Sequence, residues 1–71
     1  MLAPTHDDHV AAAGRAAAAA SAHADVCWKR FAVAAEVNAG LEEARLELLS
    51  AMAQQVYAWT VYHATAADAA A

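Results

Sequence analysis

Proline is absent from this sequence after Pro4, and the only glycines are Gly14 and Gly40. Because these two residue types interrupt helices more strongly than any others, long helices are permitted over nearly the whole chain. Alanine, the best intrinsic helix former, dominates residues 10–24, and Gly14 weakens that helix by only about 1 kcal/mol. The one plausible turn is the Asn-Ala-Gly sequence at 38–40, since Asn and Gly adopt the left-handed conformation that ends helices.

These features predict an all-α fold, an antiparallel two-helix hairpin that forms one domain over residues 1–71. Thr5 and Asp8 have the spacing of a helix-capping pair, which marks the start of the first helix. The expected elements are a first helix, a turn and a second helix, over about 6–37, 38–40 and about 41–67. One continuous helix running through Gly40 stays open as an alternative.

Both expected helices carry more apolar surface than a lone hairpin can cover. On the second helix, one face is shared by six large side chains, namely Leu41, Leu48, Met52, Val56, Trp59 and His63. Hydrophobic residues make up 62% of the chain, but 25 of those 44 are alanine, so the core of one hairpin is weak. We therefore expect two hairpins to dimerise into a four-helix bundle.

Side-chain size supports the antiparallel pairing. Folding the chain back at Ala39 places residues 16–24 beside residues 56–62. The first segment is almost entirely small, and the second contains several large side chains. Rows of alanine let helices approach closely while bulky rows fill the remaining space. Along this half of the hairpin, small side chains of the first helix therefore face large side chains of the second.

Charge, cysteine content and hydropathy exclude several classes of protein. The net charge is −4, which is the opposite of the basic surface that binds nucleic acid, so no nucleic-acid partner is expected. Cys27 is the only cysteine and the N-terminus lacks the pattern of a secretory signal, which favours a cytoplasmic protein. Residues 48–67 carry no charge, but Gln54 and Gln55 near their middle disfavour a membrane span. A membrane-spanning helix or a surface-lying one remains an alternative.

The sequence offers little for catalysis or cofactor binding. His23 and Cys27 are spaced so that both could reach one zinc ion from the same helix face. The expected pairing brings no third ligand to them, so they are weak metal candidates, and we expect no metal and no cofactor. No nucleophile and base can be paired from spacing alone, and no glycine-rich phosphate loop is present. We expect a protein that is not an enzyme.

The large apolar side chains are the candidates for a protein interface, because Trp and Tyr dominate binding hot spots. The expected seam of the dimer consists of Leu48, Met52, Val56 and Trp59. The expected anchors for another protein are Trp28, Phe31, Tyr57 and Tyr62. This interpretation makes the chain a homo-oligomeric interaction protein that acts as an adaptor or inhibitor of a partner protein. The alternative is a structural subunit of a larger particle, such as a virion or coat.

In size and alanine content the chain resembles small helical hairpins of bacteriophages and high-GC bacteria. That resemblance implies an inhibitor, a virion component or an accessory subunit. Secreted hairpins with a Trp-x-Gly turn are a second comparison, but Trp28 is followed by Lys29 and Arg30, so their signature is absent.

Overall fold

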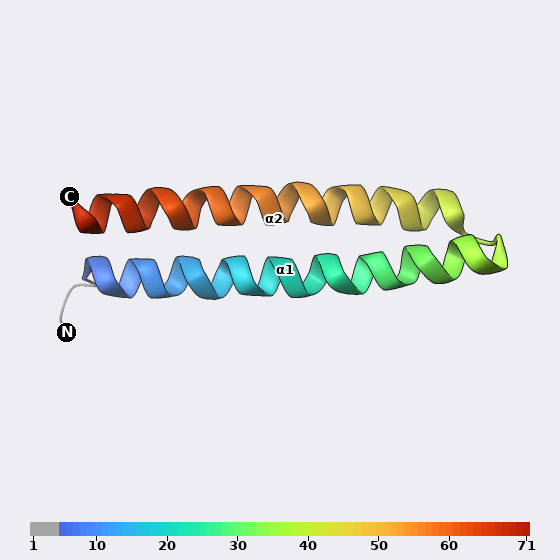
Figure 1. Cartoon of the computed structure of the whole chain (residues 1–71), viewed down its shortest axis with the longest axis horizontal. Coiled ribbons are helices and arrows are strands. Elements are labelled where there is room, and N and C mark those ends of the chain that lie inside the picture. Colours follow the sequence, from blue (N-terminus) through green and yellow to red (C-terminus); the bar gives the residue numbers. More distant parts are fainter. Residues whose placement is uncertain (1–4) are drawn as a thin grey trace.

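The computed structural model describes residues 5–71, with the side chain of His6 outside the description, and its two elements are α1 (His6–Val37) and α2 (Leu41–Ala70). The helices lie side by side and run in opposite directions, with the start of α1 and the end of α2 at one end of the hairpin (Figure 1). Residues 5–71 contain no strand. The prediction of a helical hairpin is confirmed, and α2 continues beyond its expected end near 67.

Helix α1 begins at the predicted capping pair. The Asp8 backbone N–H donates to the Thr5 hydroxyl at 3.2 Å, and the Thr5 backbone N–H donates to the Asp8 carboxylate at 3.1 Å. This reciprocal capping box satisfies two backbone donors that the first turn of a helix leaves free. Asp7 and Asp8 also place negative charge at the positive end of the helix dipole.

The turn also forms where the sequence predicts it. Asn38 has φ 53° and Gly40 has φ 67°, so both residues adopt the left-handed conformation that ends one helix and starts the next. The Ala39 backbone N–H donates to the Ala34 carbonyl oxygen at 3.2 Å, which closes the last turn of α1. The alternative of one continuous helix through Gly40 is therefore wrong.

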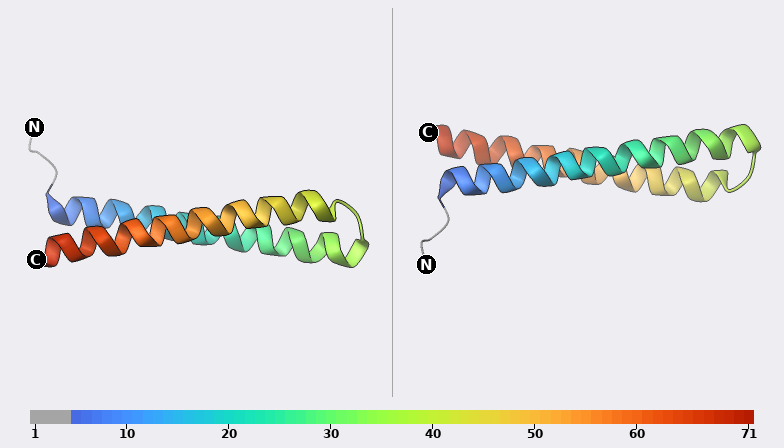
Figure 2. Two further views of the ribbon diagram at one scale, coloured as in Figure 1. Left: turned by 90° about the horizontal axis from the view of Figure 1, so that it is seen from above. Right: turned by 90° about the horizontal axis from the view of Figure 1, so that it is seen from below.

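The two helices meet along a row of residues spaced alternately by three and four, which we call the hairpin seam. All of its members are buried or half-buried: Val10, Ala13, Ala17, Ala20, Ala24, Cys27, Phe31 and Ala34 on α1, and Ala44, Leu48, Ala51, Gln55, Ala58, Tyr62, Thr65 and Ala69 on α2. This is the spacing of a coiled coil, in which helices cross at a shallow angle, and Figure 2 shows such a crossing.

The core inside the seam is built mostly from small side chains. Its buried residues are Ala17, Ala24, Cys27, Ala34, Ala44, Leu48 and Ala51. Leu48 is the one large side chain among them, with Phe31 packed half-buried against it. Since burial contributes in proportion to apolar area, this core stabilises a lone hairpin only weakly.

Three contacts across the seam fix the register of the hairpin. The Trp59 indole N–H and the Gln55 amide both donate to the Ser21 hydroxyl, at 2.8 and 3.1 Å. Nearer the turn, Arg30 lies 4.0 Å from the Glu47 carboxylate. The contact between Ser21 and Trp59 confirms the predicted pairing of residues 16–24 with residues 56–62.

Candidate protein-binding surfaces

A second apolar row runs along α2 beside the hairpin seam. Its large side chains are spaced by three, four and three residues and are 50%, 42%, 67% and 36% exposed: Leu49, Met52, Val56 and Trp59. At 100° per residue, this row is turned by about 100° from the seam. Two helices form only one seam, so within residues 5–71 this second row stays largely exposed.

Helix α1 adds Trp28 to the same side of the hairpin. Trp28 follows Ser21 by seven residues and so occupies the same position around the helix. Ser21 in turn contacts Trp59 directly. Trp28 is 53% exposed and packs edge to face on Phe31, with ring centroids 5.9 Å apart. We call the five residues Trp28, Leu49, Met52, Val56 and Trp59 the tryptophan face.

Trp59 is held in place by its neighbours on α2 as well as by Ser21. Its ring meets Tyr62 edge to face, with centroids 5.5 Å apart, and His63 lies 6.1 Å from it. Aromatic pairs in this geometry are worth about 0.5–1.5 kcal/mol beyond the area that they bury. The indole is thus oriented before any partner arrives, which lowers the entropy cost of binding.

The opposite side of the hairpin has a different character. Arg30 is nine residues, or roughly two and a half helical turns, beyond Ser21, so its ion pair with Glu47 lies on the far side. His23 and Gln54 occupy the positions one heptad away from this pair on the two helices. Polar groups therefore flank the seam on this side, where the tryptophan face has large apolar groups.

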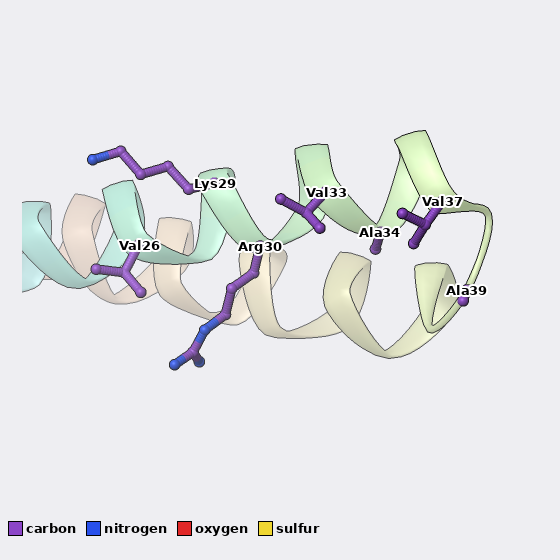
Figure 3. Close-up of a pocket in the computed structure, with 7 residues that line it drawn as sticks. All are labelled: Val26, Lys29, Arg30, Val33, Ala34, Val37 and Ala39. Atoms are coloured by element: carbon purple, nitrogen blue, oxygen red, sulfur yellow. The ribbon is translucent and has the colours of Figure 1, made fainter.

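Near the turn, this polar side carries a groove of about 430 Å³, which we call the valine groove. It is lined by Val26, Lys29, Arg30, Val33, Ala34, Val37 and Ala39 (Figure 3). Val33 and Val37 are 58% and 62% exposed. Lys29 and Arg30 extend to either side of the valines in this view, and Lys29 pairs with Asp25 at 3.1 Å.

The structure divides the predicted interface residues between several environments. Met52, Val56, Trp59 and Trp28 lie together on the tryptophan face. Leu48 is only 5% exposed and packs inside the hairpin, while Phe31 is half-buried against the same core. Tyr62 is half-buried on the seam, and Tyr57 is 72% exposed on the side that carries the valine groove.

Two residues of this surface were not anticipated from the sequence. Leu49 takes the place on the exposed row that was expected for Leu48, and Ser21 provides the acceptor that orients Trp59. The signal for Leu49 is the strict spacing of three and four residues that it shares with Met52, Val56 and Trp59. For Ser21 the indication in the sequence is weaker, because it is the one hydroxyl side chain in the alanine-rich segment 10–24.

The weak metal candidates do come together, with the Cys27 sulfur 3.8 Å from His23 Nε2. Both line a second groove of about 480 Å³ between the helices, together with Arg30, Leu46, Glu47 and Ser50. Within the described part of the chain, no three His, Cys, Asp or Glu side chains are grouped closely enough to hold a metal ion. The Cys27 thiol is 2% exposed, so the hairpin itself covers this side chain.

Two carboxylates near helix starts have perturbed acidity. The hydrogen bond from the Thr5 backbone N–H lowers the pKa of Asp8, and the Thr5 side chain adds a smaller effect. The hydrogen bond from Arg45 at 2.8 Å lowers the pKa of Glu42. Both carboxylates lie at N-terminal turns, where they stabilise the helices by their negative charge.

The remaining observations concern membranes and relatives. Neither described helix combines the length and apolar character that crossing a bilayer requires. The chain matches no protein-family model, and the searches found no similar curated protein and no similar solved structure.

Proposed function

We propose that this protein is a non-enzymatic interaction module, a helical hairpin that pairs with a second copy of itself and presents the resulting bundle to another protein. The observation that carries the proposal is the tryptophan face. Its large apolar side chains stand about 100° from the hairpin seam, which is the angle between neighbouring contacts of a helix in a four-helix bundle. In this role the protein acts as an adaptor or an inhibitor.

The thickness of the molecule supports the self-pairing. The Cα atoms extend over 52 × 24 × 12 Å, so the hairpin is one helix thick. A layer of this kind can bury one seam, and here that seam contains mostly alanine. A second copy on the tryptophan face would supply the large buried side chains that the single chain lacks.

The side that carries the valine groove supports a role toward another protein. When two copies pair through the tryptophan face, this side stays on the outside of the bundle. It presents exposed apolar side chains among charged ones, with Tyr57 at 72%, Leu46 at 55% and Val33 at 58% exposure. An apolar centre with a polar rim is the usual anatomy of a protein-binding surface.

Self-pairing is tested with two substitutions at adjacent positions of α2. Met52→Glu places a charge on the tryptophan face, whereas Ala53→Glu places the same charge on the outer side of the helix. We expect Met52→Glu to dissociate the dimer in sedimentation velocity and Ala53→Glu to leave it intact. If both variants sediment as the unmodified protein does, the tryptophan face is not the contact between copies.

Binding to another protein is tested by capture from a native lysate with the unmodified protein and with Val33→Glu. Val33→Glu puts a charge into the valine groove without touching the hairpin seam, so we expect it to stay dimeric and to lose the captured protein. If Val33→Glu captures the same protein equally well, the partner binds outside the valine groove. The alternative function, a subunit of a larger particle, predicts polymers that grow with concentration instead of a closed dimer.

A further inference from the structure

The size of the exposed side chains differs between the two halves of the surface that faces the second copy. On α1 this surface is formed mostly by small residues, Ala11, Gly14, Ala18, Ser21, Ala32 and Ala35, interrupted by Asp25 and Trp28. On α2 it is formed by Leu49, Met52, Val56, Trp59 and His63. The hairpin therefore presents a strip of small side chains on α1, which we call the low strip, beside a strip of large side chains on α2, which we call the high strip.

The area available on this surface is large enough for a stable pair of copies. The chain exposes 5214 Å², whereas a compact monomer of 7.3 kDa exposes about 4,200 Å². The difference, on the order of 1,000 Å², is comparable to the roughly 800 Å² that each partner buries in an interface of standard size. One face of this hairpin, about 52 Å long and 24 Å wide, is large enough to provide that area.

A two-fold pair of hairpins can be stacked in two ways. In one, the α1 helices of the two copies lie on each other and the turns are at opposite ends of the bundle. The small side chains on α1 of one copy then meet the small side chains on α1 of the other. Met52 and Trp59 on α2 of one copy meet the same large side chains on α2 of the other. The two layers would be held apart along one edge and too far apart to touch along the other, which leaves voids that a packed core does not tolerate.

We infer that the second copy is stacked in the other way, with α1 of each copy on α2 of the other and both turns at the same end of the bundle. At matching heights, Ala18 then faces Trp59 of the second copy, and Ser21 faces Val56 of the second copy. The low strip of one copy thus receives Val56, Trp59 and His63 of the other, while Met52 and Leu49 lie opposite Asp25 and Trp28, the two residues that interrupt the low strip. The inference rests on the proposed self-pairing and specifies its geometry.

Electrostatics agrees with burial of this surface. Its charged residues are Asp7 at the start of α1, Asp25, which pairs with Lys29 at 3.1 Å, and Glu42 and Arg45, which form a 2.8 Å ion pair near the turn. Between Leu49 and Trp59 the strip on α2 contains no charged side chain. A second copy can therefore cover the centre of the strip without burying an unpaired charge.

The arrangement is tested by the distance between nitroxide spin labels in double electron–electron resonance. The background is Cys27→Ala, which fits the alanine core, and the labels are attached in Ala39→Cys at the turn or in Ala67→Cys near the other end. Circular dichroism and mass of both labelled chains should match those of the unmodified protein. Both positions are exposed, so the labels do not enter the seam.

With the turns together, labels at position 39 should lie within roughly 30 Å of each other, because neighbouring helices in a bundle are about 8–10 Å apart. A mixed dimer labelled at 39 in one copy and at 67 in the other should give a distance near the length of the hairpin. A dimer in which the two labels at 39 are separated by about the 52 Å length overturns the inference and leaves the proposed function standing. A monomeric mass with no dipolar signal would contradict both the inferred stacking of the two copies and the proposed self-pairing.

Discussion

The indole N–H of Trp59 donates a hydrogen bond of 2.8 Å to the hydroxyl of Ser21 on the opposite helix. The same hydroxyl accepts a second hydrogen bond from Gln55, which uses both of its lone pairs. The nearest seam residues on α1 are Ala17, Ala20 and Ala24, and Ala51 and Ala58 flank Gln55 on α2; these side chains are too small to fix how far one helix slides along the other. Ser21 therefore sets the register of the hairpin at its middle.

Replacing Ser21 with Ala should destabilise the hairpin, although Ala is the better helix former. The loss of the acceptor for two donors costs roughly 0.5–1.5 kcal/mol each, reduced where water can replace it, against a propensity gain of about 0.5 kcal/mol. Ser50→Ala is the matched control at an exposed position and should stabilise slightly. Urea unfolding of the two variants measures the difference, and a stabilised Ser21→Ala variant would show that this hydroxyl does not hold the helices.

Trp59→Ala should lower the free energy of unfolding of the proposed dimer by on the order of 3 kcal/mol, because the proposed pairing covers the ring from both copies. In a single hairpin the side chain is 36% exposed, so a smaller loss is expected without the second copy. Thermal unfolding at two protein concentrations separates the two contributions. Tyr57→Ala, at a 72% exposed ring, is the control and should change stability by no more than about 0.5 kcal/mol. An unchanged melting temperature for Trp59→Ala would show that the Trp59 side chain is not part of the packed core.

Gly14→Ala should stabilise the protein by roughly 0.5 kcal/mol. Alanine gains about 1 kcal/mol over glycine inside a helix, but the added Cβ would lie 3.2 Å from Tyr62 Cε1. That ring is half-buried, and we expect it to shift by the few tenths of an ångström that the Cβ needs, so that part of the gain survives. Ala22→Gly, at an exposed position of α1, measures the propensity difference without the contact. Destabilisation by Gly14→Ala would mean that the Tyr62 ring cannot move.

Acid should weaken the protein through the two carboxylates at the helix starts. Hydrogen bonds lower the pKa of Asp8 and of Glu42 in the folded chain, so the stability that they contribute is present above their unfolded pKa values and is lost as pH falls through the folded ones. The melting temperature should therefore decrease when the pH is lowered below about 4.

The double variant Asp8→Asn, Glu42→Gln isolates this effect. Its melting temperature should depend less on pH in the acid range than that of the unmodified protein. Glu43→Gln removes one negative charge at a carboxylate for which the described residues provide no ion pair, and it should leave the slope nearly unchanged. Equal slopes for the double variant and the unmodified protein would show that neither carboxylate stabilises the folded state.

The local features that decide the fold could be predicted because each depends on a few adjacent residues. The capping box needs only Thr5 and Asp8, and the turn needs only Asn38 and Gly40, which can adopt positive φ. The antiparallel pairing followed from the position of that turn. Once two helices of this length are joined by so short a turn, few other arrangements remain.

The division between core and surface was harder to predict because it depends on the period of packing. The single face drawn through Leu41, Leu48, Met52 and Val56 assumes 3.6 residues per turn, whereas helices that wrap around each other repeat every 3.5. Leu48 thus lies on the seam and Leu49 on the exposed row. Alanine adds to the ambiguity, because a residue with so small a side chain fits a core and a surface equally well.

In the proposed dimer, two hairpins complete each other's core through the tryptophan face. Light-scattering mass of the untagged protein across a concentration series tests this pairing most directly. We expect a constant mass of twice 7.3 kDa over the whole series, with helical circular dichroism throughout. A folded monomer of 7.3 kDa at every concentration, or a mass that grows without limit, would contradict it.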